Sequence, residues 1–177
     1  MPVCEIHLQP RDSAEPLIVK DFDLIKQMPV VLRAVELENP DWETTDTILA
    51  TPLPIPFEKE TMEFMFNNMR RYKAPAEDDF ETKAEDYPEA YAKDVYDLKP
   101  IIELANYTEN TDFMNCIGFV IAKKLEKMSI ESIAEFLGVE CLPEGNFFDE
   151  KDGWIHAPAE LFEAEQPQAA GAAPQAQ

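Results

Sequence analysis

Glycine and histidine are scarce in this sequence, and their scarcity excludes several kinds of site. Only 5 glycines occur among 177 residues, and none belongs to a G-x-G-x-x-G or G-x-x-x-x-G-K-[ST] motif, so the usual phosphate-binding loops are excluded. The 2 histidines, His7 and His156, have no partner at the spacing of a zinc site or a catalytic triad. We therefore expect a protein that is not an enzyme and binds neither a cofactor nor a metal.

Cysteines and long apolar runs are also few. The 3 cysteines, Cys4, Cys116 and Cys141, are odd in number and far apart, which argues against a disulfide framework and fits a reducing compartment. No window approaches the length of apolar sequence that a membrane helix needs, and the N-terminus has no signal-peptide pattern. We expect no membrane span and a location in the cytoplasm and nucleus.

What the sequence has in excess is negative charge. It contains 36 Asp and Glu against 15 Lys and Arg, for a net charge of −21. Nucleic acids and anionic membranes are bound mainly through lysine and arginine, so we expect neither as a partner. A cationic protein surface is the natural complement, although the charge could equally serve only to keep the chain in solution.

Residues 97–139 contain three consecutive helical patterns with almost no linker between them. Apolar residues recur at i, i+3, i+4 and i+7 from Leu98 to Ala105, which predicts a first helix. A second helix is predicted from Asp112 to Lys127, and its apolar arc is so wide that it needs cover on more than one side. The third pattern, Ile130 to Leu137, ends at Gly138, a residue suited to closing a helix in the left-handed conformation.

The first half of the chain predicts strands, helices and a loop. Alternating apolar and polar residues from Cys4 to Gln9 predict a half-buried strand, and a second short strand is predicted at Leu17 to Val19. Proline is tolerated at a first helical position, so Pro29 predicts two helices that meet there. A further helix is predicted from about Glu58 to Tyr72, followed by an acidic, flexible and solvated loop over residues 74–94.

Several short motifs follow one another in an order found in one known family. Pro52-Leu53-Pro54 matches part of a V-P-L-P signature, and Ala105-Asn106-Tyr107 lies in a segment similar to L-F-E-L-I-L-A-A-N-Y-L-D-I. Apolar positions from Ile121 to Val139 follow the motifs V-A-N-M-I and K-T-P-E-E-I-R-K-T-F-N-I. From residue 3 to about residue 154 the chain thus resembles the Skp family, whose members join F-box proteins to a cullin in SCF ubiquitin ligases.

The resemblance implies a fold and a division into regions. It implies an α+β fold of the BTB/POZ type, a small three-stranded sheet with helices, over residues 1–128. A C-terminal helical extension over residues 129–162 would serve F-box binding and dimerisation. Residues 163–177, which are rich in Ala, Gln and Pro, are expected to form a disordered tail.

The resemblance also implies two partner-binding surfaces. Asn106 and Tyr107 are the candidates for facing a cullin N-terminal domain, because tyrosine combines apolar area with a hydroxyl group. The candidates for facing an F-box protein are Ile121, Leu125, Ile133, Leu137, Val139 and Trp154. Judged from the residues alone, Asn106 and Tyr107 could equally cap and plug a helix end, and each apolar candidate could equally belong to the core. An exposed apolar groove would also promote self-association of the free protein.

Departures from the family pattern begin near Gly118, and they keep three interpretations open. Gly145 and Gly153 each weaken the family's last helix by about 1 kcal/mol relative to alanine. The first interpretation is a non-catalytic adaptor in an SCF E3 ubiquitin ligase. The second is a Skp-like scaffold in a non-ligase complex that has lost cullin or F-box binding. The third, an elongin-C-like or channel-tetramerisation-like BTB module, is disfavoured by the extension after Val139.

Overall fold

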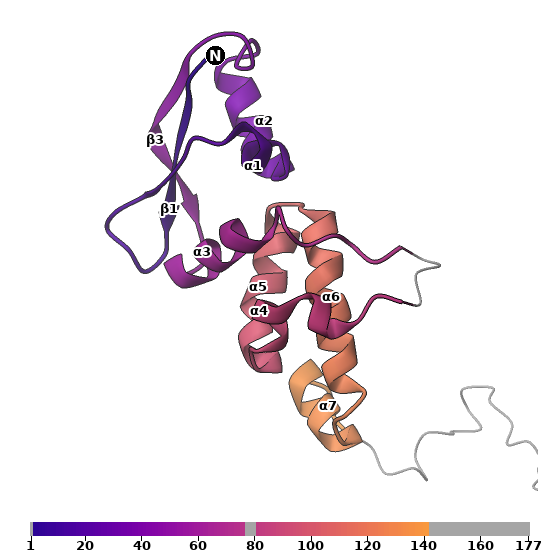
Figure 1. Cartoon of the computed structure of the whole chain (residues 1–177). Helices are drawn as coiled ribbons and strands as arrows, with labels where there is room; N and C mark the ends of the chain where they lie inside the picture. The colour runs from indigo at the N-terminus through magenta and orange to yellow at the C-terminus, as the bar shows by residue number, and fades with distance from the viewer. Residues whose placement is uncertain (1, 77–80, 142–177) are drawn as a thin grey trace, which may run out of the picture.

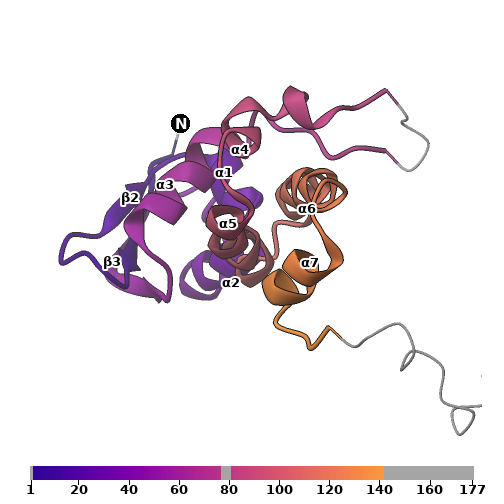
Figure 2. The ribbon, with the colours of Figure 1, turned by 90° about the horizontal axis from the view of Figure 1, so that it is seen from below.

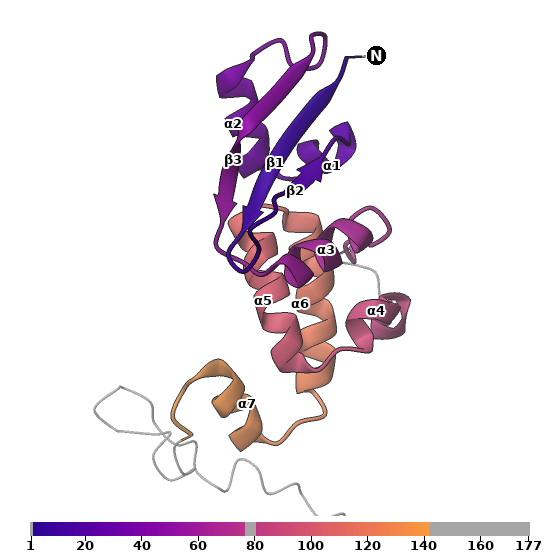
Figure 3. The same cartoon turned by 90° about the vertical axis from the view of Figure 1, so that its left-hand side faces the viewer.

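The computed structural model describes residues 2–76 and 81–141 of the chain. Within these residues the protein is a mixed α+β structure, with a small sheet, seven α-helices and one short 3-10 helix. The sheet lies at one end of the elongated molecule and the last helix at the opposite end, with two long helices between them (Figures 1 and 3). The α+β class predicted from the sequence is confirmed.

Three strands form the sheet in the order β2-β1-β3. The strands are β1 (Cys4–Pro10), β2 (Leu17–Val19) and β3 (Thr47–Ile55). Strand β1 runs antiparallel to β2 and parallel to β3, so β3 is an outer strand. An irregularity interrupts the second pairing, because Ile6 lies opposite Leu49 whereas Leu8 lies opposite Leu53.

The helices follow the order that the sequence pattern predicts, with two additions. They are α1 (Phe22–Lys26), α2 (Pro29–Glu38), α3 (Lys59–Asn68), α4 (Pro88–Tyr91), α5 (Val95–Tyr107), α6 (Thr111–Leu125) and α7 (Ile130–Leu137), with the 3-10 helix η1 (Ala84–Asp86) before α4. Helices α1 and α2 cover one face of the sheet (Figures 1 and 3). Viewed from below, α7 lies beside the lower ends of α5 and α6 (Figure 2).

Strand β1 is half-buried, as its alternating pattern predicts. Its residues at positions 4, 6, 8 and 10 are buried, and those between them are partly exposed. On the partly exposed face the Glu5 carboxylate accepts contacts of 2.8 Å from His7 Nε2 and 2.8 Å from Lys20 Nζ. These contacts lower the pKa of Glu5, with the bond from His7 the largest cause. His7 thus belongs to a cluster of polar side chains on the partly exposed face of the sheet.

The predicted meeting of two helices at Pro29 and the predicted end of the last helix at Gly138 are both confirmed. Helix α1 ends at Lys26 and α2 begins at Pro29, so two separate helices meet there. Asp21 Oδ1 begins α1 by accepting hydrogen bonds from the amides of Asp23 (2.9 Å) and Leu24 (3.2 Å). Gly138 closes α7 with φ of 69°, the left-handed conformation for which glycine is suited.

Helix α5 begins earlier than its apolar stripe indicates. Asp94 caps it by accepting a hydrogen bond of 2.9 Å from the Tyr96 amide, and this start places Pro100 inside the helix. An internal proline removes one backbone hydrogen bond and costs about 3 kcal/mol. Burial of Val95, Leu98 and Ile101 on the same helix offsets that cost.

The prediction of a solvated loop over residues 74–94 is wrong for residues 84–91. These residues form η1 and α4 and bury Ala84, Tyr87 and Ala90. The Tyr87 ring lies edge-on to Tyr72, with 5.1 Å between ring centroids, and edge-on to Phe119 at 6.1 Å. The average acidity of the segment masked these few apolar residues, which are enough to pack a short helix against α6.

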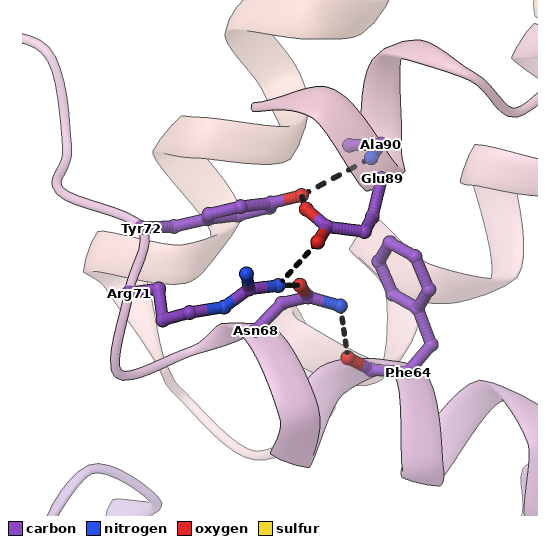
Figure 4. A network of polar contacts seen from close by, with 6 residues as sticks. All are labelled: Phe64, Asn68, Arg71, Tyr72, Glu89 and Ala90. Carbon is purple, nitrogen blue, oxygen red and sulfur yellow. Dashed lines mark hydrogen bonds and ion pairs between the residues drawn. The ribbon is translucent and has the colours of Figure 1, made fainter. Parts of the chain in front are cut away.

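A polar network holds α4 to the end of α3 (Figure 4). Arg71 Nη2 donates to Glu89 Oε1 at 2.6 Å and to Asn68 Oδ1 at 2.5 Å. The Tyr72 hydroxyl donates to Glu89 Oε2 at 3.0 Å and accepts from the Ala90 amide at 3.1 Å. The bond from Arg71 is the main cause that lowers the pKa of Glu89, and burial raises the pKa of Tyr72 to about 12.

Tyr72→Phe should destabilise the protein in a pH-dependent way. The substitution leaves the buried Ala90 amide without its acceptor, so we expect the free energy of unfolding at pH 7 to fall by about 1–3 kcal/mol. Because the folded-state pKa of Tyr72 is raised from 10.0 to about 12, the contribution of its neutral form is complete below pH 10 and is lost as the pH rises toward 12. Denaturant unfolding should show the gap between wild type and variant narrowing above pH 10, and a gap that stays constant would contradict this role.

Candidate partner-binding surfaces

A polar-aromatic corner forms where α5 ends. Asn106 and Tyr107 are both exposed, and the Tyr107 side chain retains 38% of its accessible surface. The Tyr107 ring packs against the Phe57 ring, with ring centroids 5.7 Å apart and ring planes inclined by 60°. One side of the ring therefore supports the fold, while the rest of Tyr107 and Asn106 are open to a partner. Neither side chain caps the helix, whose C-cap residue is Thr108.

Contacts from α2 fix this corner in place. Arg33 Nη2 and Nη1 donate to Glu109 Oε1 and Oε2 at 2.7 and 2.8 Å, a bidentate ion pair across the two elements. The guanidinium of Arg33 lowers the pKa of Glu109. Glu109 has φ of 61°, and the Val30 amide donates to the Thr108 carbonyl at 3.4 Å. The corner is thus a fixed shape held by side-chain and backbone bonds.

The residues predicted to face an F-box protein lie in different environments. Ile121 is only 7% exposed and belongs to the core, because it lies on the face of α6 that also buries Phe113 and Ile117. Leu125 and Ile133 are partly buried, and Leu137 and Val139 each keep 58% of their surface exposed. Trp154 lies outside the described residues. The structure therefore moves Ile121 from the candidate surface to the core.

Helix α7 presents an apolar face to solvent. This α7 apolar face comprises Ile130, Ile133, Leu137 and Val139, of which Ile130 is 68% exposed. Ile130 was part of the predicted helical pattern but not of the predicted surface. Its exposure depends on which neighbours pack against the first turn of α7, which the apolar spacing alone does not reveal.

One aromatic contact attaches α7 to the rest of the protein. Phe136 is 9% exposed and lies edge-on to Tyr96 of α5, with centroids 5.6 Å apart and planes inclined by 74°. Ala134 of α7 is also buried, and Ser129 Oγ caps the helix by accepting from the Ser132 amide at 3.3 Å. Sequence reasoning did not single out Phe136, although its spacing of three residues from Ile133 was a usable signal.

Two searches of the described residues bear on other kinds of site. No group of three or more His, Cys, Asp or Glu side chains in residues 2–76 and 81–141 could hold a metal ion. Over the same part of the chain, no helix has the length and apolarity needed to cross a bilayer.

Phe136→Ala should cost much more stability than the neighbouring Leu137→Ala. Loss of the buried ring should lower the free energy of unfolding by about 3 kcal/mol, whereas the exposed leucine should change it by about 0.5 kcal/mol or less. Urea unfolding followed by circular dichroism measures both variants, which share the same helix and the same new residue. Equal losses would show that α7 is not attached through Phe136.

No family model matches the chain, and no curated protein matches it. The likeness to the Skp family rests on the residue pattern of the sequence alone.

Proposed function

We propose that this protein is a non-catalytic adaptor that links an F-box substrate receptor to a cullin scaffold in an SCF E3 ubiquitin ligase. On this proposal the sheet and helices α1 to α6 are a BTB/POZ domain, and α7 begins the C-terminal F-box-binding extension. The three-stranded sheet with two helices on one face and a following helical pair supports the proposal.

The observation that carries the proposal is the α7 apolar face. Ile130, Leu137 and Val139 each keep more than half of their surface exposed on or just after a helix of eight residues. A partner that covers these three side chains removes their remaining exposed apolar area from water, which favours binding. A partner's amphipathic helix packed against α7 would cover them, which is the helix-in-groove mode of recognition.

The geometry of α5 lets two partners bind at once. Tyr96 near its start contacts α7, and Tyr107 at its end forms the corner. Tyr107 is eleven positions after Tyr96, and an α-helix rises 1.5 Å per residue, so the two residues are about 16 Å apart along the helix axis. An F-box protein on the α7 apolar face and a cullin on the corner would therefore contact different ends of one rigid element.

A Skp-like scaffold in a non-ligase complex is the second candidate function. The observation that favours it is the burial of Ile121 in the core, where this residue is not available to an F-box protein. The α7 apolar face would then bind a helix of a different class of protein. With either function, the α7 apolar face is exposed to water while no partner is bound. We therefore expect the free protein to self-associate at high concentration.

Two sets of substitutions should separate the proposed surfaces. We expect Asn106→Lys with Tyr107→Lys to weaken binding of a cullin N-terminal domain at least tenfold while binding of an F-box domain is retained. Leu137→Glu with Val139→Glu should have the opposite effect, because two carboxylates would face the partner's apolar helix. Isothermal titration calorimetry with each purified domain measures both affinities.

Leu37→Glu is the matched control for these variants. Leu37 is 88% exposed on α2, so its change adds charge to an apolar surface position outside both proposed surfaces and should leave both affinities unchanged. If wild type binds neither domain, the adaptor function is wrong. Binding of the F-box domain alone would favour the non-ligase scaffold.

A further inference from the structure

A hollow of about 260 Å³ lies where the end of α6 passes α4 and the start of α5. It is lined by Tyr91, Asp94, Val95, Lys124, Lys127 and Met128. We call it the lysine groove. None of its residues belongs to the corner or to the α7 apolar face, so an argument about its ligand stands independently of the proposed adaptor function.

Two lysines one helical turn apart share one aromatic ring in this groove. Lys124 Nζ lies 4.9 Å and Lys127 Nζ 5.8 Å from the centroid of the Tyr91 ring. Lys124 Nζ also donates to the Tyr91 carbonyl at 2.7 Å. This bond uses one of the three N–H groups of the ammonium, so two remain to bind a ligand. A cation near the face of a tyrosine ring is attracted to it, so the ring holds both ammonium groups toward the groove.

These two lysines lack the ion pairs that other cations of this acidic chain make. Arg33, Arg71 and Lys123 each pair with a carboxylate at 2.6–2.7 Å. Within residues 2–76 and 81–141, neither Lys124 nor Lys127 has such a pair. Lys73, Lys83 and Lys99 also have no such pair, but among the described residues only Lys124 and Lys127 lie together at one aromatic ring.

The one carboxylate of the lining, Asp94, has a structural role and keeps its negative charge. Asp94 accepts the hydrogen bond from the Tyr96 amide that begins α5. The floor between the charges is apolar, since Val95 is buried and Met128 partly buried. The C-terminal end of α6 favours lysine through the helix dipole, but the dipole does not account for the aromatic ring and the apolar floor that accompany the charges.

We propose that the lysine groove binds an acidic peptide segment of a partner protein. Carboxylates of the segment contact Lys124 and Lys127, and an apolar side chain between them packs on Val95 and Met128. Charge complementarity identifies the ligand, because the groove is a local cationic site on a chain with net charge −21. At physiological salt, interactions between exposed charges are screened beyond about 8 Å, so the two near lysines outweigh the distant acidic surface.

The proposal is tested with the full-length chain and a defined probe. The probe is a fluorescein-labelled Glu-Asp-Leu-Glu-Asp peptide, compared with the same peptide carrying Gln and Asn, by fluorescence anisotropy at physiological salt, where the distant acidic surface is screened. We expect the acidic peptide to bind at least tenfold more tightly than the amide peptide. Lys124→Gln with Lys127→Gln should abolish this preference and leave F-box and cullin binding unchanged.

Lys73→Gln with Lys99→Gln is the matched control, since it makes the same change of net charge at two exposed lysines outside the groove. Equal losses in both double variants would show a general charge effect and overturn the proposal. Absence of binding to the acidic peptide, or binding of only a phosphoserine version, would also overturn it.

A measurement on the wild-type chain removes any dependence on how the variants fold. Carbodiimide joins lysine amines to nearby carboxylates, and mass spectrometry of the digested product identifies the lysines that were joined. The acidic probe should be joined to Lys124 and Lys127 in preference to Lys73 and Lys99. Joining of Lys124 and Lys127 to carboxylates of residues 142–177 in place of the probe would overturn the assignment to a separate partner.

Discussion

The burial of one face of α5 is the constraint on which the rest of the structure depends. This helix packs on α3 and α6 and buries Leu98, Ile101 and Leu104 deep in the core. Its end forms the corner, and its start contacts α7 and borders the lysine groove. All three surfaces therefore keep fixed relative positions because one helix carries or contacts each of them.

Ion pairs and aromatic contacts fix the positions of turns and short helices more than they stabilise the fold. The Arg33–Glu109 pair is more than half exposed on the arginine side, and pairs of this kind contribute little to stability in water. It nevertheless fixes the turn between α5 and α6 against α2. The ring pair of Tyr72 and Tyr87 does the same for α4, with burial supplying the energy. A strongly acidic chain thus uses its few cations to position turns and short helices.

Periodicity in the sequence predicted the strand at Cys4, the break at Pro29 and the end of α7 at Gly138, because local spacing and local conformation determine these features. It did not predict α4, since a few buried residues were averaged with many acidic ones. It also did not distinguish buried Ile121 from exposed Leu137, because spacing identifies an apolar face but not the neighbour that covers it. The lysine groove was not predicted either, as Tyr91 and Lys124 are 33 residues apart.

The outer position of β3 has a consequence for strand addition at this edge of the sheet. An unpaired strand edge offers N–H and C=O groups to which another chain can add a strand. Pro52 lies in the irregular part of β3 and Pro54 opposite Gln9, and proline has no N–H to donate. With donors missing at these two alternate positions, the second half of β3 is a poor template for sheet extension.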